Sequence, residues 1–196
     1  MSKSDISTRQ QEIIEASGRI LINKGIKGLT TKNLAMEMDF SESAIYRHFK
    51  NKEDIIVLFF DAMLENFNLR LNEIISREIS AIEKLKVLFE SQFNYISQNP
   101  HFTVAILADE IYFEGERVKE TLLKIFAFKS DIILSIIQQG KKEGLIRSDI
   151  NNEDLLHMII GSFRLQILKW RYDNFNFNLQ EEGEKIMHTI LILIKK

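Results

Sequence analysis

Hydrophobic residues recur every three to four positions along most of the chain, which is the spacing of amphipathic helices. After residue 51, for example, Ile56, Phe59, Met63 and Phe67 lie on one side of a helix. No segment has a convincing strand pattern, and there is no internal repeat or low-complexity linker. The sequence therefore predicts an all-α chain of about nine helices, over residues 7–24, 30–38, 42–49, 52–74, 82–97, 102–112, 118–139, 152–172 and 180–194.

Local signals mark where these helices begin and end. Gly25 ends the first helix, and Asn99 and Pro100 break the one that begins near residue 82. Gly115 separates residues 102–112 from the long helix that follows. Polar residues suited to accept from the first free backbone N–H groups are the expected N-caps: Ser7, Thr30, Ser41, Asn51 and Asn152.

Residues 30–52 form the most informative stretch. Leu34 and Ala35 give a short first helix one apolar face, and Ile45 and Phe49 do the same for a short second helix. Between them Asp39 lies where the chain must turn, and Asp tolerates a left-handed backbone better than most residues. This pattern predicts a helix-turn-helix whose second helix suits a DNA major groove.

The stretch also resembles the DNA-binding domain of the TetR family of bacterial repressors, over about residues 9–60. The family usually has Gly where this chain has Asp39, and we expect slight strain at that turn. The resemblance rests on Thr30-Thr31, Leu34-Ala35, Phe40-Ser41 and the run Ile45-Tyr46-Arg47-His48-Phe49-Lys50-Asn51-Lys52.

The resemblance implies an N-terminal three-helix helix-turn-helix domain and a C-terminal helical bundle for effector binding and dimerisation. We place the boundary between residues 1–52 and 53–196. In the family, positions matching Thr31, Tyr46, His48 and Lys52 touch the DNA backbone, and helix positions 42–44 and 47 vary with the operator. The candidate DNA-binding residues are Thr31, Lys32, Glu42, Ser43, Ala44, Tyr46, Arg47, His48, Lys50 and Lys52.

Charge modifies this picture only slightly. The chain has a net charge of −2, but residues 1–50 hold eight Lys/Arg and six Asp/Glu, so the other 146 residues carry −4. Affinity for DNA depends on the number of phosphates that are neutralised, so a single copy would bind poorly and two copies on one site would double that number. Glu42 can only accept, for instance from a cytosine amino group, or it stabilises the start of its helix.

The helix over residues 152–172 has apolar residues around roughly 220° of its wheel, more than the stripe of about 100° that one buried side needs. We therefore expect it to be buried on two sides, and expect the last two helices to form a four-helix dimer interface. Candidate interface residues are Leu155, Ile159, Ser162, Gln166, Met187, Ile190 and Leu191.

Twelve of the fourteen phenylalanines follow residue 55. For any one of them a filled core is the simpler interpretation, but TetR-like proteins usually bind a small effector in this part of the chain. A lipophilic effector, such as an acyl chain or an aromatic compound, would suit the apolar lining. The candidate pocket residues are Phe89, Phe93, Phe102, Ile106, Phe113, Phe126, Met158 and Phe163.

Other chemistry has little support. The chain has no Cys, and its four histidines (His48, His101, His157 and His188) lack metal-ligand spacing, so we expect no metal and no cofactor. No catalytic motif is present, so we expect no enzyme. No apolar run approaches the roughly 20 residues that span a membrane. A bacterial cytoplasmic location is expected, at the nucleoid when DNA is bound.

The sequence thus predicts a transcriptional regulator, a homodimeric repressor that a small effector releases from a near-palindromic DNA operator. The alternative is an all-helical protein-interaction module whose helix-turn-helix docks a protein partner, for which the acidic body and the small N-terminal charge excess argue.

Overall fold

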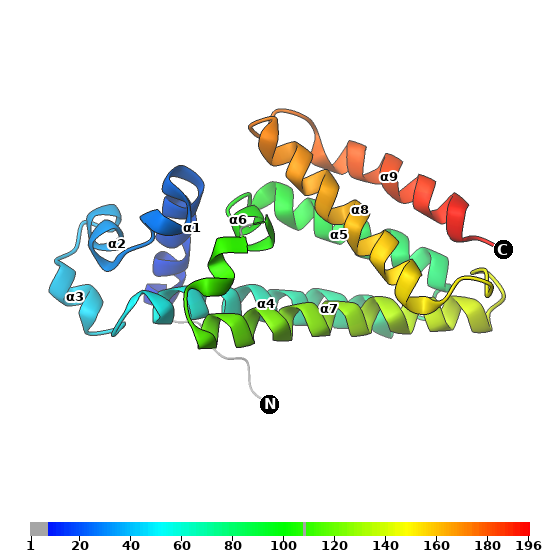
Figure 1. Cartoon of the computed structure of the whole chain (residues 1–196), viewed down its shortest axis with the longest axis horizontal. Helices are drawn as coiled ribbons and strands as arrows, with labels where there is room; N and C mark the ends of the chain where they lie inside the picture. The colour runs from blue at the N-terminus through cyan, green and yellow to red at the C-terminus, as the bar shows by residue number, and fades with distance from the viewer. Residues whose placement is uncertain (1–7, 108) are drawn as a thin grey trace. The chain divides into compact units, whose positions relative to one another are not determined.

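A computed structural model of the chain describes residues 8–107 and 109–196. Over these residues the chain forms nine α-helices and one 3-10 helix, with a single isolated bridge between Ile146 and Lys195 in place of any sheet, which confirms the all-α prediction. The helices are α1 (Thr8–Gly28), α2 (Thr31–Glu37), α3 (Glu42–Tyr46), α4 (Lys52–Ser76), α5 (Ala81–Gln98), α6 (Phe102–Leu107), η1 (Asp109–Phe113), α7 (Glu116–Lys142), α8 (Asn152–Tyr172) and α9 (Leu179–Ile194) (Figure 1).

Most helix starts follow from local side-chain caps. Thr30 Oγ1 accepts from the backbone N–H of Asn33 at 3.1 Å, and Ser41 Oγ accepts from that of Ala44 at 3.3 Å. Asn51 Oδ1 accepts from Asp54 N at 3.0 Å. These three caps confirm the predictions. The cap of α8 is Asn151, whose Oδ1 accepts from Asp154 N, so the prediction of Asn152 is wrong by one residue. The predicted cap Ser7 lies outside the described residues.

Two predicted helices are shorter than expected. The helix predicted over residues 42–49 ends at Tyr46, because the N–H groups of His48 and Phe49 both bond to the carbonyl of Ile45 and close the chain into a turn. The helix predicted over residues 102–112 is divided into α6 and the tighter 3-10 turn η1. Gly25 has φ 64°, a conformation that favours glycine, and it breaks the helical backbone near the end of α1 as predicted.

The chain divides into two compact units. Unit 1 comprises the described residues up to Glu65 together with residues 104–123, and unit 2 comprises residues 66–103 and 124–196. In unit 1, helices α1, α2 and α3 pack around a buried apolar core that includes Ile20, Leu34 and Ile45. Residues 104–123 therefore belong to the unit that carries the helix-turn-helix, which a division of the sequence at residue 52 does not anticipate.

Unit 2 is built on the packing of α9 against α5 and α8, and Figure 1 shows these helices side by side. Phe89 and Phe93 of α5 and Phe163 of α8 form one ring cluster, with centroid separations of 6.0, 6.0 and 4.9 Å. Close approach of α9 depends on Gly183, since a Cβ at this position would lie 2.3 Å from Cδ2 of Phe93. The ring cluster and this glycine fix how α5 and α9 meet.

Candidate functional site

The turn between α2 and α3 has the conformation that the sequence predicts. Asp39 has φ 55°, in the left-handed region, and the N–H of Phe40 bonds to the carbonyl of Ala35 at 2.8 Å. Asp adopts this conformation at some cost relative to Gly. The ring of Phe40 lies beneath the guanidinium of Arg9, with Cζ 4.5 Å from the ring centroid. The turn thus holds α3 against the unit 1 core, in which Ile45 and Phe49 are buried.

The other sides of α2 and α3 carry the candidate DNA-binding residues. Glu42, Ser43, Tyr46, Arg47, His48, Lys50 and Lys32 are exposed, while Thr31, Ala44 and Lys52 are half-buried. Tyr46 is 52% exposed, a large value for an aromatic side chain in a unit with a filled core. These residues therefore form one accessible polar surface, and their contacts with DNA stay a prediction.

Three of these residues form a cluster between the two helices. The hydroxyl of Thr31 lies 3.2 Å from Oε1 of Glu42 and 3.3 Å from the hydroxyl of Tyr46. Thr31 and Tyr46 offer the hydroxyl donors that suit a phosphate oxygen, whereas the Glu42 carboxylate repels one. The cluster thus combines two groups that favour a DNA backbone contact with one that opposes it.

Lys52 has a partner that the sequence did not indicate. Its Nζ lies 2.7 Å from Oε2 of Glu114, and both side chains are partly buried. Glu114 follows η1, more than sixty positions along the chain, so no local pattern predicts this pair. A phosphate would have to compete with Glu114 for Lys52, which makes Lys52 the weakest of the predicted backbone contacts.

Arg117, three residues after Glu114, makes a second set of contacts with the first turn of α4. Arg117 forms an ion pair with Asp54, and its backbone N–H donates to Oε1 of Glu53 at 2.9 Å. The hydrogen bond from Arg117 lowers the pKa of Asp54, and the backbone N–H of Lys50 lowers it further. Since the pKa is lowered in the folded chain, this contribution to stability is present above pH 3.8 and is lost as the pH falls through the lowered value.

Arg9 is a basic residue near this surface that the sequence prediction missed. Together with Ala44, Arg47 and His48 it lines a shallow hollow of about 290 Å³ beside α3. The only sequence signal for Arg9 is its charge near the start of α1, which does not indicate proximity to α3. Its place over Phe40 puts a second guanidinium beside Arg47.

The candidate pocket residues divide into two sets. Phe89, Phe93, Phe102 and Phe163 are buried in unit 2, and Ile106 is half-buried in unit 1. The other three are exposed, so they do not share one enclosed cavity with the buried phenylalanines: Phe113 at 84%, Phe126 at 59% and Met158 at 36%.

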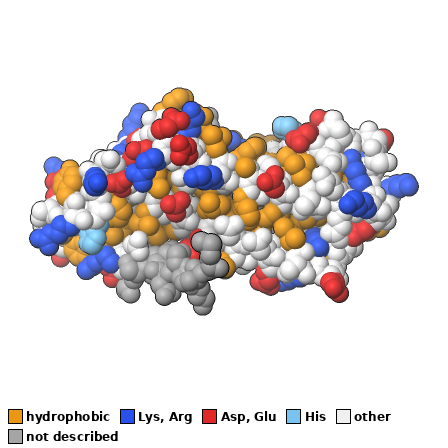
Figure 2. Space-filling view, turned by 90° about the horizontal axis from the view of Figure 1, so that it is seen from below, with side chains coloured by type: hydrophobic (Ala, Val, Ile, Leu, Met, Phe, Trp, Pro, Cys, Tyr) orange, Lys and Arg blue, Asp and Glu red, His pale blue; other side chains and the backbone are white. Residues whose placement is uncertain are grey.

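Phe126 instead lies in a shallow groove between α7 and α8 in unit 2. The groove has a volume of about 360 Å³ and includes Leu134, Ile160 and Gly161. Figure 2 shows hydrophobic side chains reaching the surface of the face that carries α4 and α7, and exposed Leu69 and Phe126 are among the large apolar residues of these helices. This apolar groove is open to solvent in the single chain.

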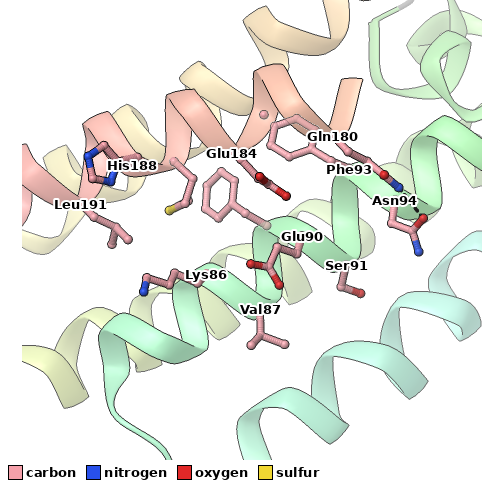
Figure 3. A pocket seen from close by; sticks show the side chains of 13 residues that line it. Lys86, Val87, Glu90, Ser91, Phe93, Asn94, Gln180, Glu184, His188 and Leu191 are labelled. Carbon is pink, nitrogen blue, oxygen red and sulfur yellow. Dashed lines mark hydrogen bonds between the residues drawn. The ribbon is translucent and has the colours of Figure 1, made fainter. Parts of the chain in front are cut away.

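A larger hollow of about 580 Å³ lies between α5 and α9. Figure 3 shows Lys86, Glu90, Glu184 and His188 around it, with the ring of Phe93 on its floor. Its rim is therefore polar, and its apolar floor is the outer side of the ring cluster. Nothing in this hollow brings several donors or acceptors together on one point, so we assign it no ligand.

The predicted dimer residues also need correction. Six of the seven are at most 5% exposed within a single chain, and only Ser162 is half-buried. They pack in the unit 2 core, because the faces of α8 and α9 that carry them contact their own subunit. The six are Leu155, Ile159, Gln166, Met187, Ile190 and Leu191.

Within the described ranges, no group of three or more His, Asp or Glu side chains is placed to hold a metal ion. The helices in those ranges also include none that is long and apolar enough to cross a membrane.

Comparison with known proteins agrees with this architecture. The family model "Bacterial regulatory proteins, tetR family" matches residues 13–57, and the model "YsiA-like protein, C-terminal region" matches residues 60–193, more than half of the chain. The nucleoid occlusion factor SlmA of Vibrio vulnificus (strain YJ016) is 22% identical over the full length of both chains.

Two solved structures show the same fold. One is the transcriptional regulator FadR from Bacillus subtilis in complex with stearoyl-CoA, with a TM-score of 0.81, 21% identity and coverage of 92% of this chain and 97% of that one. The other is the fatty acid degradation regulator FadR from Bacillus halodurans, with a TM-score of 0.83, 16% identity and coverage of 94% and 95%. With the two family matches and the helix-turn-helix geometry, the chain belongs to the tetR family of bacterial regulatory proteins.

Proposed function

We propose that this regulator is a homodimeric repressor that binds a near-palindromic operator in the bacterial cytoplasm and leaves it when a small apolar effector binds unit 2. The observation that carries the proposal is the exposed polar surface of α2, α3 and the turn after α3, where Tyr46 lies beside the Thr31 hydroxyl and Arg47 and Lys50 are exposed. In a dimer each α3 would lie in one major groove, and two grooves on one face of DNA are about 34–36 Å apart.

The outer face of α8 supports the dimer. Met158, Leu165 and Tyr172 are exposed and Leu168 is half-buried, and their spacing places all four on one stripe opposite the buried side of the helix. On α9, Leu193 is 52% exposed. An apolar stripe on α8 beside an exposed apolar residue of α9 favours a second copy of the same helix pair, which would form a four-helix interface.

The aromatic interior of unit 2 supports an apolar effector. Phe89, Phe93 and Phe163 form a continuous ring cluster there. One structural relative is in complex with stearoyl-CoA and another is a regulator of fatty acid degradation. We therefore propose a ligand with a fatty acyl or similarly apolar body for this chain.

The contacts at the start of α4 offer a route from the effector to DNA. Glu114 and Arg117 hold Lys52 and Asp54 within unit 1, directly after the recognition helix and its turn. Both α4 and α7 have residues in unit 1 and in unit 2. An effector that shifts α7 would therefore pull on the turn of α4 that follows Phe49, and so change the spacing of the two α3 helices.

The replacement Leu165→Glu tests the proposal. Two charged residues facing each other across the α8 stripe are expected to weaken dimerisation at least tenfold, and operator affinity should fall with it because a monomer contacts half of the phosphates. Sedimentation velocity and an operator titration at matched protein concentration measure the two effects.

The matched control is Leu69→Glu, which adds the same charge at a residue of α4 that is 69% exposed. It is expected to leave both the mass and the affinity as in the unmodified protein. A Leu165→Glu protein that stays dimeric would place the interface elsewhere, and one that is monomeric with full operator affinity would refute dimeric recognition.

A further inference from the structure

Two half-buried cations, one on α4 and one on α7, contact the same aromatic ring in unit 2. The Nζ of Lys129 lies 5.0 Å from the ring centroid of Phe67 and 5.2 Å from that of Phe163. The guanidinium of Arg70 lies 5.4 Å from Phe67 and 4.2 Å from Tyr95. Ring faces attract cations, but a contact of this kind offsets only part of the cost of taking a charge from water.

Neither cation has a carboxylate partner among residues 8–107 and 109–196. Arg70 donates to the neutral Asn66 Oδ1 at 2.6 Å and to the carbonyl and hydroxyl of Ser91 at 3.0 and 2.8 Å. The Nη2 of Arg70 is buried and has no hydrogen-bond partner among the described residues. Burial, and to a smaller extent the positive charge of Arg70, lower the pKa of Lys129 to about 8. Two like charges are thus held together without a counter-charge.

A third group with unmet hydrogen-bonding capacity lies on the neighbouring segment of α5. Gln92 is 2% exposed, and within the described residues neither its Nε2 nor its Oε1 has a partner. It lies on α5 directly after Ser91, which bonds to Arg70, and directly before Phe93, which contacts Phe163. Figure 3 shows the Ser91 side chain pointing away from α9, on the α4 side of α5. A buried amide without partners costs free energy that folding does not recover.

We propose that Arg70, Lys129 and Gln92 bind the carboxylate of an amphipathic small molecule whose apolar body lies against the aromatic residues of unit 2. The inference rests on the proposed effector function and names the chemical class of the effector. A carboxylate can accept from Nη2 of Arg70, from Nζ of Lys129 and from Nε2 of Gln92, and it supplies the negative charge that both cations lack. A purely apolar ligand would leave all three groups unsatisfied.

The direct test compares ligands that differ only at the head group. Octanoate, decanoate and palmitate, their methyl esters and their CoA thioesters are titrated into the full-length protein by calorimetry. At least one free carboxylate is expected to bind at least tenfold more tightly than its methyl ester. Equal affinity of acid and ester, tighter binding of the thioester alone, or no binding by any of the three acids would overturn the proposal.

Variants locate the carboxylate. Lys129→Met and Arg70→Met are each expected to reduce affinity for the acid at least tenfold, down to that of the ester, and to leave ester binding unchanged. Lys124→Met is the control, because Lys124 is an exposed lysine on the same helix. The melting temperature of ligand-free Lys129→Met should equal or exceed that of the unmodified protein, since an uncompensated cation is removed. Unchanged acid affinity in Lys129→Met would refute its role.

The pH dependence gives a readout that a merely structural role does not produce. With a pKa of about 8 in the ligand-free protein, Lys129 is charged below that pH and loses its proton above it. Acid affinity should therefore fall as the pH rises above 8 in the unmodified protein and stay level in Lys129→Met. Arg70, whose charge acts on Lys129, stays protonated in this range, and burial raises the pKa of Tyr95, which lies against Arg70, to about 12.

The carboxylate site and the proposed regulator function can be tested separately. If the protein binds its operator but discriminates no acid from its ester, only the carboxylate site is wrong. If it binds a carboxylate but no DNA, the site stands and the regulator function is wrong.

Discussion

The variant Tyr46→Phe is expected to lose operator affinity by roughly 30-fold to 150-fold. Tyr46 is 52% exposed, and its hydroxyl lies 3.3 Å from that of Thr31, in the cluster that faces away from the unit 1 core. Each lost hydrogen bond to a phosphate is worth about 1 to 1.5 kcal/mol, and a dimer loses two. Fluorescence anisotropy with operator and unrelated DNA should show the same loss on both, because phosphates carry no sequence information.

Glu42→Gln provides the opposite case in the same cluster. Its carboxylate lies 3.2 Å from the Thr31 hydroxyl, so removing the charge should raise affinity for all DNA by about twofold to tenfold at low salt. Lower operator affinity in Glu42→Gln would instead show that Glu42 accepts from a base. Full affinity in Tyr46→Phe, or a loss confined to the operator, would remove Tyr46 from the phosphate-binding role.

Gly183→Ala is expected to destabilise the protein by about 2 kcal/mol, although alanine favours a helix over glycine by about 1 kcal/mol. The new Cβ would lie 2.3 Å from Cδ2 of Phe93, whose ring is 2% exposed and packed against Phe89 and Phe163. Because the ring packs against Phe89 and Phe163, relief of the contact requires the ring cluster to repack or α9 to move away from α5. Urea denaturation at a fixed protein concentration measures the change in the free energy of unfolding.

A compensating change identifies the cause of that loss. Phe93→Leu shortens the side chain that meets position 183, so the double variant Gly183→Ala/Phe93→Leu should be more stable than the sum of the two single changes predicts. Thr189→Ala, at an exposed position of α9, should change stability by no more than about 0.5 kcal/mol. Strictly additive effects of Gly183→Ala and Phe93→Leu would contradict this account of the contact.

The parts of the fold that local physics decides could be predicted from the sequence. Thr30, Ser41 and Asn51 cap helices because a short polar side chain reaches an N–H group three residues ahead. Asp39 takes the left-handed turn because the chain must reverse between two apolar faces. Where two candidates are adjacent, as at Asn151 and Asn152, local pattern does not decide, and the prediction missed by one residue.

Features that depend on distant packing could not be predicted. The distribution of apolar residues around α8 indicated two buried sides. It did not distinguish the side that packs within the subunit from the side that faces a second chain, so Leu155 and Ile159 were assigned to the second-chain side although they are buried within the subunit. Composition likewise grouped Phe113 with Phe89, although one is 84% exposed and the other buried. The ion pair between Lys52 and Glu114 joins segments that are far apart in the sequence, and no local pattern around either residue predicts it.

The two cations of unit 2 are also a feature that depends on distant packing. Arg70 and Lys129 are ordinary charged residues on two amphipathic helices when the sequence is considered alone. Their significance appears only when folding brings both to the ring of Phe67, where no carboxylate of the described residues pairs with either. Sequence reasoning identified the apolar character of this unit, and the structure adds the polar groups that would fix the orientation of a ligand.

The most direct test of the central claim is a titration of the purified protein against DNA from upstream of its own gene and against a shuffled copy of that fragment, over a range of salt concentrations. The account predicts at least hundredfold preference for the native fragment at low salt, two chains per site, and a steep linear fall of log affinity with log salt as phosphate contacts are lost. Equal affinity for both fragments together with a shallow dependence on salt would contradict it and favour a protein-interaction module.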